Sequence, residues 1–356
     1  MRIRLAILES DMNYLSRITA LFTEKFADKL EVHSFSDEKL ALNDLAGANI
    51  DVFVAGSVFN IETSELPPRC GFAYLVDSPR IDTYREQRAI NRFQKADLIY
   101  KEILRIYSDV ADVSAIGFKL ESGETSTRVI AFVSACGGVG SSSMAAACAV
   151  SLTKRGLPVV YLNCEQFGSS NIFFSDQGNR NFSDVIYSLK SKKSNLLLKL
   201  ESTVKQDEET GVHYYDQANL ALDVMEMREE DYEQLFSGLS AMNYSHIILD
   251  MDFSLNAECL DVLRMAQTLV FVSDGSEMSN VKFARALASL MILDQQNGTD
   301  LCHRITLLYN RFSSKTSKRL DNGHLVVLGG APKYERATTR RIVEQLAGMP
   351  LFEELI

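Results

Sequence analysis

A run of glycines and hydroxyl side chains at residues 134–143 has the composition of a phosphate-binding loop. An apolar, β-branched run at 128–134 predicts a buried strand before the loop, and residues 144–154 predict a helix after it, ended by Gly156. Glycines let backbone N–H groups converge on phosphate oxygens, and a helix N-terminus adds partial positive charge. The alternative is a turn of small residues that binds nothing. The candidate nucleotide-contacting residues of the loop are Cys136, Gly137, Gly138, Val139, Gly140, Ser141, Ser142 and Ser143.

A hydroxyl and a carboxylate predict a Mg²⁺ site beside this loop. Ser142 stands where phosphate-binding loops carry the Ser or Thr that binds Mg²⁺. Residues 246–250 form an apolar run that ends in Asp250, as expected for a strand whose last residue holds Mg²⁺ through a bound water. Ligands gather at the carboxyl edge of a parallel sheet, where Asp250 is expected. We therefore expect Ser142 and Asp250 to serve as metal ligands.

The loop resembles the deviant Walker A motif of the ParA/MinD family, K-G-G-x-G-K-[ST]-[ST]. Cys136 and Ser141 stand where that motif has its two lysines. The resemblance implies ATP and Mg²⁺ as cofactors. Phosphoryl transfer depends chiefly on stabilising developing negative charge, so the loss of both cations implies weak or slow hydrolysis.

The next two motifs also follow that family. Asn163 and Glu165 stand for the two aspartates of its D-x-D switch, which implies that Glu165 positions the attacking water, with Asp250 as the other catalytic residue. An exposed carboxylate at a strand end is an equally weighted alternative for Glu165. Residues 251–256 are similar to the D-L-P-x-S-L-N segment of CpaE/TadZ proteins, the pilus-assembly branch of the family, with Asp252 in place of the proline.

The resemblance extends to the expected adenine site. Asn310 and Arg311 match the family's strand ending in N-[RK], in which the Asn amide pairs with the adenine edge through its donor and its acceptor. An ordinary turn Asn is the alternative. Residues 329–332 correspond to the family's loop beside the base, which makes Pro332 a candidate nucleotide contact.

Residues 1–120 resemble a receiver domain of the flavodoxin-like type. Glu9 and Asp11 fall where a receiver's acidic Mg²⁺ pocket begins, and Lys101 matches the lysine that a receiver has after its fifth strand. Gly56 occupies the position of the phosphoacceptor Asp, so the domain is expected to make contacts and to accept no phosphate. A generic α/β domain is the alternative. The expected strands are 2–8, 30–35, 51–55, 71–76 and 97–100.

Composition and length suit a two-domain α/β protein. The chain has 356 residues, of which 46% are hydrophobic, and a net charge of −10, so no global field attracts nucleic acid or an anionic membrane. Residues 121–127 are expected to link the receiver-like domain to an ATP-binding domain at 128–356 with a largely parallel sheet. The expected strands of that domain are 128–134, 158–163, 245–250, 268–272, 304–309 and 324–328. The segment 190–209 is expected to be a solvated helix and loop.

Six scattered cysteines without a C-x-x-C pair indicate a reducing compartment. Neither a signal peptide nor a transmembrane run is apparent, and the acidic end at 352–356 does not favour membrane anchoring. The expected location is the cytoplasm, including a cell pole.

The CpaE/TadZ resemblance implies a dimeric ATP-binding protein that positions a Tad (Flp) pilus machinery. Its expected partners are a second copy of the chain and pilus or secretion components, with DNA and direct membrane insertion not expected. The alternatives are a DNA-partition or cell-positioning ATPase, a signalling regulator with an ATPase output, and a nucleotide-free scaffold. The partition alternative depends on a basic set of residues, which are Lys315, Lys318, Arg319, Arg336, Arg340 and Arg341.

Overall fold

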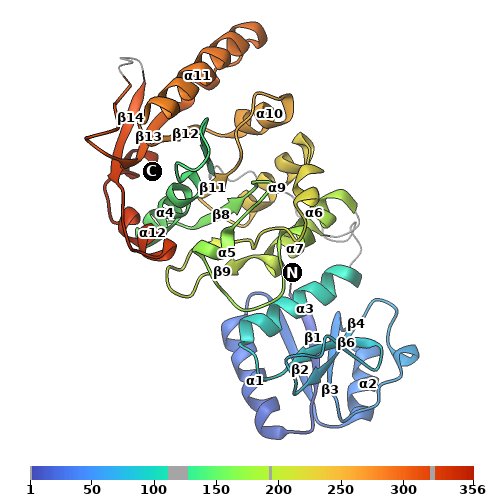
Figure 1. Cartoon of the computed structure of the whole chain (residues 1–356). Helices are drawn as coiled ribbons and strands as arrows, with labels where there is room; N and C mark the ends of the chain where they lie inside the picture. Colours follow the sequence, from blue (N-terminus) through green and yellow to red (C-terminus); the bar gives the residue numbers. More distant parts are fainter. Residues whose placement is uncertain (1, 111–126, 192–194, 321–324) are drawn as a thin grey trace. The chain divides into compact units, whose positions relative to one another are not determined.

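The computed structural model describes residues 2–110, 127–191, 195–320 and 325–356 (Figure 1). The chain divides into two compact units. Of the described residues, the first unit comprises 2–110 together with 191 and 195–202, and the second comprises 127–190 together with 203–320 and 325–356.

The first unit contains a six-stranded sheet in the order β2-β1-β3-β4-β6-β5. All neighbouring strands pair in parallel except β5, which runs antiparallel to β6. This is the doubly wound order of flavodoxin-like folds, with a short hairpin added at one edge. The strands are β1 (Ile3–Leu8), β2 (Leu30–Phe35), β3 (Val52–Gly56), β4 (Gly71–Val76), β5 (Thr83–Tyr84) and β6 (Gln87–Asn91).

Helices cover both faces of this sheet, because side chains alternate along its buried strands. The alternate residues Val52 and Val54 of β3 pack in one cluster with helices α1 (Met12–Lys25) and α3 (Ala96–Val110). Phe53, between them, belongs to a second cluster with helix α2 (Glu38–Gly47). The connection from β3 to β4 contains the short 3₁₀ helix η1 (Thr63–Glu65).

The strand predicted at 97–100 is wrong, because these residues belong to α3. The fifth parallel strand is β6. Lys101 consequently lies inside a helix and not directly after a strand. The residue that follows β6 is Arg92.

The second unit contains an eight-stranded sheet in the order β14-β13-β12-β7-β11-β8-β10-β9. Only the short outer strand β9 runs antiparallel to its neighbour among the pairs of the described residues. The strands are β7 (Arg128–Val133), β8 (Val159–Asn163), β9 (Lys205–Gln206), β10 (His213–Tyr214), β11 (His246–Asp250), β12 (Thr268–Ser273), β13 (Ile305–Phe312) and β14 (Val326–Pro332). The α/β class and the largely parallel sheets predicted from the sequence are confirmed.

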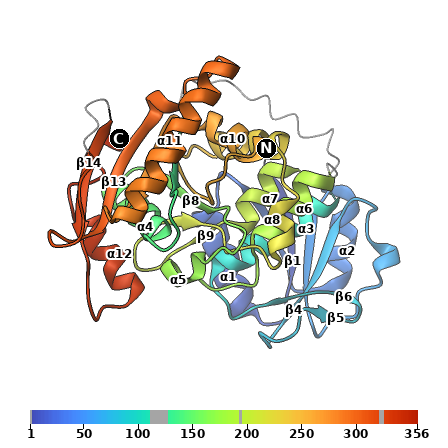
Figure 2. The same ribbon diagram turned by 45° about the horizontal axis from the view of Figure 1, so that its top comes forward.

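The main core of this unit forms around helix α4 (Ser141–Lys154), which follows the phosphate-binding loop. Residues from Met144 to Val150 are fully buried, and most are alanine, so the helix can lie close to the sheet. Helix α12 (Thr339–Ala347) packs beside α4, as Figure 2 shows. The end of the chain joins the same core through Phe352 and Leu355.

The opposite face of the sheet carries other helices. Phe283 of α11 (Glu277–Asn297) packs edge-on against Phe271 of β12 with ring centroids 5.2 Å apart. Phe271 alternates with Val270 and Val272, which face the core around α4. The remaining helices of the unit are α5 (Ser170–Phe173), α6 (Phe182–Ser191), α8 (Ala221–Met225), α9 (Glu229–Ala241), α10 (Ala257–Met265) and the 3₁₀ helices η2 (Leu301–Arg304) and η3 (Glu353–Leu355).

The segment 190–209 differs from its prediction as a solvated helix and loop. Leu200, in helix α7 (Leu196–Thr203), is fully buried. Lys205 is also buried, and its Nζ donates a hydrogen bond to Asp216 Oδ2 at 2.5 Å. A paired lysine can be buried at an acceptable cost, which the charge-rich sequence alone does not reveal.

Candidate functional site

The glycine-rich loop predicted to bind phosphate lies between β7 and α4, and its backbone forms an open turn. Gly138 and Gly140 have φ of 80° and 87°, a left-handed conformation that favours glycine. A Cβ atom added at Gly137 or Gly138 would meet nothing within 4 Å, so this part of the loop faces open space. At the start of the loop, Ser134 Oγ accepts a hydrogen bond from the N–H of Cys136 at 3.1 Å. The loop can therefore admit a ligand against its backbone.

Asn310 supports the end of the loop. A Cβ atom at Gly140 would lie 2.4 Å from Asn310 Nδ2, so only glycine fits there. Asn310 Nδ2 donates to the carbonyl of Val139 at 2.8 Å, and Oδ1 accepts from the backbone N–H of Arg311 at 2.9 Å. Both ends of the amide are thus used within the protein. The contact of Asn310 with adenine stays a prediction.

A cluster of polar side chains lies beside the loop at the carboxyl ends of β8 and β11. Tyr161 donates its hydroxyl hydrogen to Asp250 Oδ2 at 2.7 Å. Asn163 Nδ2 lies 3.0 Å from both Asp250 Oδ2 and Glu165 Oε2. Ser142 Oγ donates to Glu165 Oε1 at 3.1 Å. Ser142, the second residue of helix α4, is thus bonded directly to Glu165, and Asn163 links Glu165 to Asp250.

Burial disfavours the ionised forms of the two carboxyl groups in this cluster. Asp250 is completely buried, which raises the pKa of its carboxyl well above the ordinary 3.8, and the charge of Glu165 adds to the rise. Burial also raises the pKa of Glu165 from 4.5, against the hydrogen bonds from Asn163 and Ser142. Among the described residues, Asp250 Oδ1 and Ser141 Oγ are buried without a hydrogen-bond partner. Buried polar atoms usually have a hydrogen-bond partner, so these two oxygens are available to a ligand at this site.

These residues fit a magnesium ion and a phosphate group. Mg²⁺ prefers oxygen ligands, and Ser142 and Asp250 offer a hydroxyl and a carboxylate with an unsatisfied oxygen. The N-terminus of α4 offers free backbone N–H groups to an anion. Bound Mg²⁺ would supply positive charge next to two carboxylates whose ionised forms are disfavoured.

The loop borders a cavity of about 310 Å³. Of the residues predicted to form the site, those from Cys136 to Ser143 all line this cavity, and so do Glu165 and Arg311. Asp250 and Asn310 lie buried behind these residues. The cavity is completed by residues that the sequence did not single out for contact, and these are Ser134, Ser169, Phe173, Met251, Asp252 and Phe253.

Pro332 lies elsewhere, at the end of β14. It lines a second cavity of about 310 Å³ with Tyr309, Phe312 and Arg319. The residues expected to form a loop beside the base are part of β14 itself. A role for Pro332 in binding the base stays a prediction.

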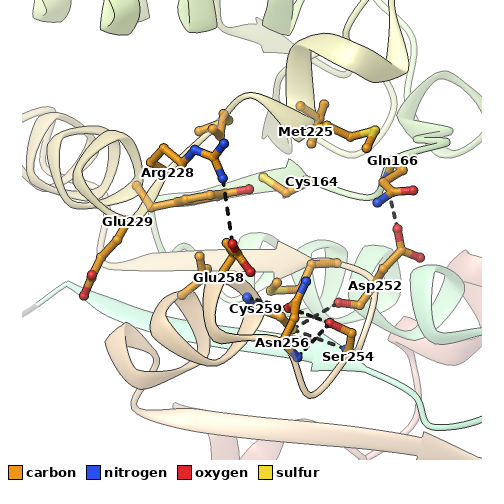
Figure 3. Close-up of a pocket in the computed structure, with 15 residues that line it drawn as sticks. Cys164, Gln166, Met225, Arg228, Glu229, Asp252, Ser254, Asn256, Glu258 and Cys259 are labelled. Atoms are coloured by element: carbon orange, nitrogen blue, oxygen red, sulfur yellow. Dashed lines mark hydrogen bonds and ion pairs between the residues drawn. The ribbon is translucent and has the colours of Figure 1, made fainter.

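A third and larger cavity, of about 430 Å³, shares Met251 and Asp252 with the cavity at the loop. Figure 3 shows its polar wall. Gln166 donates its backbone N–H to Asp252 Oδ2 at 2.9 Å, and Arg228 lies 3.9 Å from Glu258. Asp252 thereby holds the segment after β8 against the segment after β11. A proline at this position, as in the CpaE/TadZ motif, would not make that bond.

Two features of the cluster were missed by the sequence interpretation. Tyr161 looked like one apolar residue among others in a buried strand, and no sequence signal marks its hydroxyl. Asn163 was recognised only as a substitute for Asp, although it bridges the two carboxylates.

In the receiver-like unit the predicted acidic pocket is closed. Glu9 is 2% exposed, and its Oε1 accepts from the backbone N–H groups of Ser10 and Asp11 at 2.8 and 3.1 Å. Asp11 caps helix α1 by accepting from the backbone N–H groups of the next turn. A Cβ atom at Gly56 would lie 2.9 Å from Glu9 Oε2, so an aspartate there would meet a buried carboxylate.

Arg92 brings a cation to this pocket. Its Nη1 lies 3.5 Å from Glu9 Oε2 and its Nε lies 2.6 Å from Asp77 Oδ1. The residue after the fifth parallel strand therefore provides the charge that the sequence analysis assigned to Lys101. That assignment was wrong because the fifth strand was predicted at 97–100, whereas it lies about ten residues earlier, at Gln87–Asn91.

Fold and site together define an α/β domain of the P-loop type preceded by a receiver-like domain. The family model of the TadZ-like receiver domain matches residues 1–108. Comparison with curated proteins finds no match.

Solved structures similar to this chain are ParA and MinD proteins. The ParA family ATPase of Chlorobium tepidum TLS is 18% identical, with a TM-score of 0.50, and the match covers 64% of this chain and 96% of that one. A chain of the MinC:MinD cell division complex of Aquifex aeolicus is 15% identical, with a TM-score of 0.48 and coverage of 64% and 96%. MinD of Pyrococcus horikoshii OT3, solved with Mg-ADP, is 17% identical, with a TM-score of 0.47 and coverage of 62% and 94%.

At these identities the structural likeness establishes the fold. The chain joins a TadZ-like receiver domain to a P-loop domain of the ParA/MinD ATPase fold. None of the helices among the described residues is long and apolar enough to cross a membrane.

Proposed function

We propose that this protein binds ATP with Mg²⁺ at the loop of residues 134–143 and hydrolyses it slowly. The observation that carries the proposal is the combination of an open glycine turn with the unsatisfied Oδ1 of Asp250 behind it. A loop that had become a mere structural turn would gain nothing from a buried carboxylate oxygen without a donor. The ParA/MinD ATPase fold supports ATP as the nucleotide.

Isothermal titration calorimetry with Mg-ATP tests the binding. The wild-type protein is expected to bind ATP, and to bind it more weakly when EDTA removes Mg²⁺. Asp250→Asn keeps the size of the side chain and removes the charge, so it is expected to lose most of the Mg²⁺ dependence. Absence of binding by the wild type at millimolar Mg-ATP would favour a nucleotide-free scaffold instead.

We further propose that the second unit forms a homodimer through its nucleotide-binding face. The support is the ParA/MinD resemblance, in which the dimer forms face to face around the nucleotides. Light scattering of the wild type and of Asp250→Asn, each with and without Mg-ATP, measures the mass in solution. A monomer at every concentration and in every nucleotide state would remove this part of the proposal.

The cellular role that we propose is to position a Tad (Flp) pilus machinery at one site of the cell, such as a pole. The support is the match of residues 1–108 to the TadZ-like receiver domain. Gly140→Ala should block the loop, because its Cβ would meet Asn310 Nδ2 at 2.4 Å. Pili counted on host cells that carry this variant are expected to fall, and unchanged piliation with unchanged protein level would contradict the role.

Two of the six basic residues on which the DNA-partition alternative depends, Arg340 and Arg341, are paired with carboxylates. Arg341 Nη1 lies 2.8 Å from Glu344, and Arg340 lies 3.9 Å from Glu209. Paired in this way, these two side chains present little net positive charge to a phosphate backbone. Salt-dependent binding of double-stranded DNA would overturn this reading.

A further inference from the structure

Arg311 brings a cation to a loop whose sequence provides none. Its guanidinium Nη1 donates a hydrogen bond to the carbonyl of Gly138 at 2.7 Å. Its Nε would lie 3.8 Å from a Cβ atom on Gly140. The guanidinium group therefore lies along the glycine turn, beside the start of α4 where Ser141 stands in place of a lysine.

The backbone of β13 is distorted at the point that places this side chain. The register between β13 and β14 shifts between Tyr309 and Phe312. Arg311 lies in that bulge with φ of 54°, a left-handed conformation that costs energy for any residue except glycine. Bulges next to binding sites often re-aim a side chain. The neighbouring Asn310 fixes the bulge to the loop through its bond to the Val139 carbonyl.

The charges around the cavity leave Arg311 available. Among the described residues that line the cavity at the loop, Arg311 is the only lysine or arginine, whereas Glu165 and Asp252 are both carboxylates. No ion pair of the described residues joins Arg311 to a carboxylate; its printed side-chain bond goes to a neutral carbonyl. A guanidinium group held only by a carbonyl oxygen can exchange that acceptor for a phosphate oxygen, which carries more charge.

We propose that Arg311 neutralises phosphate charge in the bound nucleotide, in place of the lysines absent at Cys136 and Ser141. Without nucleotide the Arg311 guanidinium donates to the Gly138 carbonyl, and with a nucleoside triphosphate it donates to the terminal phosphate oxygens. Arginine suits this task because its planar fork stays charged and binds phosphate through two parallel bonds. The inference rests on the proposed function, since it requires a nucleotide at this loop.

Arg311→Gln tests the charge alone, because glutamine keeps an N–H donor for the Gly138 carbonyl. Calorimetry with Mg-ATP and with AMP compares ligands with and without terminal phosphates. A charge-assisted hydrogen bond lost from the complex should weaken Mg-ATP binding by about 10- to 100-fold. AMP binding should change by about threefold or less, because AMP lacks the β- and γ-phosphates. Arg311→Lys should retain most of the Mg-ATP affinity.

Arg336→Gln is the matched control. Arg336 is also an exposed arginine with a left-handed φ, of 60°, but it does not line the cavity at the loop. The Arg336→Gln variant should bind Mg-ATP as the wild type does. Adding Ser141→Lys to Arg311→Gln should restore affinity, because it returns a cation to the loop from the other side. Urea unfolding of each variant confirms that the fold is intact.

The outcomes separate the inference from the function on which it rests. If the wild type binds no nucleotide, both fail. If the wild type binds Mg-ATP and Arg311→Gln binds it equally well, the proposed function stands and the role of Arg311 is overturned. Equal weakening of Mg-ATP and AMP would also overturn it, because a merely structural role of the bulge would affect both ligands.

Discussion

Both units of this protein resemble phosphate-handling domains, and both lack residues on which that chemistry depends. In the receiver-like unit Gly56 replaces the phosphoacceptor, and the adjacent Glu9 is buried and bound by backbone N–H groups and Arg92. In the second unit both lysines are missing, yet the loop stays open and Asp250 keeps an unsatisfied oxygen.

The difference shows two results of losing catalytic groups. In the receiver pocket the Glu9 side chain fills the space beside Gly56 and pairs with Arg92 and backbone N–H groups, so it forms part of a folded core. The loop of the second unit has kept open space beside a buried, electrostatically unfavourable cluster, which a bound cation would stabilise. Open space at the loop and filled space at Gly56, rather than the number of motif residues lost, distinguish the two sites.

The largest expected effect comes from restoring the receiver's acceptor. Gly56→Asp would place a Cβ atom 2.9 Å from Glu9 Oε2 and a second carboxylate beside it. Overpacking and like-charge repulsion should lower the free energy of unfolding by about 3 kcal/mol. Urea unfolding measures this loss, with Gly47→Asp as the control, because a Cβ there meets nothing within 4 Å.

The same variant tests whether the pocket is closed to chemistry. Incubation with acetyl phosphate followed by intact mass measurement should show no adduct on the wild type or on Gly56→Asp. A stable, stoichiometric adduct on residues 1–108 of either protein would contradict the comparison.

A smaller effect is expected at the buried carboxylate of the second unit. At a pH above the raised pKa of Asp250, where its carboxylate is ionised, Tyr161→Phe removes the 2.7 Å hydrogen bond to Asp250 Oδ2. It should then cost about 2 kcal/mol, because the lost bond goes to a charged group. Tyr74→Phe in the receiver unit removes a bond between neutral groups, from the Ile61 N–H at 3.1 Å, and should cost about 1 kcal/mol. Chemical denaturation compares the two, and equal losses would mean that Asp250 carries no special charge burden.

Restoring lysines to the loop should raise the hydrolysis rate. Ser141→Lys should accelerate ATP turnover about tenfold, or about 1.4 kcal/mol of barrier, by compensating charge that develops on the γ-phosphate. Cys136→Lys together with Ser141→Lys should exceed either single change. Phosphate release under saturating ATP measures the rates. If all three variants bind ATP and none is faster than the wild type, the limit on turnover lies with Asn163 and Glu165, which would have to place the attacking water.

The smallest effect is a pH dependence of stability without metal. The pKa values of Asp250 and Glu165 are raised by burial, so the folded state holds protons that the unfolded state releases. The stability associated with these groups is therefore present below their ordinary values of 3.8 and 4.5 and is lost as the pH rises toward the raised values. The urea midpoint of the metal-free wild type should fall over this range relative to Asp250→Asn, and Mg²⁺ with ATP should reduce the fall. Parallel midpoints of the two proteins would contradict the raised pKa of Asp250.

The sequence predicted most of the fold because the inner strands are long apolar runs. It failed at 97–100, where three apolar residues in a row fit either a strand or a helix turn. The i, i+3 and i+4 spacing of Tyr100, Ile103 and Leu104 continues along α3 and decides for the helix. The true strand β6 is a short run, Gln87–Asn91, with little apolar pattern. Arg92 was missed as a consequence.

Within the site, motif residues such as Arg311 were found from type and spacing, but the long-range contacts that they make, and the hydroxyl of Tyr161, were not. Tyr161 lies 89 residues before Asp250, and Arg311 lies 173 residues after Gly138. Only the sheet order, which places β8 beside β11 and carries β13 to the loop edge, brings these partners together. The bulge that aims Arg311 has no sequence signal, since arginine rarely adopts a left-handed φ.

A crystal structure with Mg²⁺ and a non-hydrolysable ATP analogue tests the central claim most directly. The account predicts that the triphosphate lies against residues 136–143, with Mg²⁺ next to Ser142 and Asp250 and with the Arg311 guanidinium moved from the Gly138 carbonyl to phosphate oxygens. A loop that stays empty at millimolar analogue, with Asp250 Oδ1 bonded to protein groups alone, would contradict it.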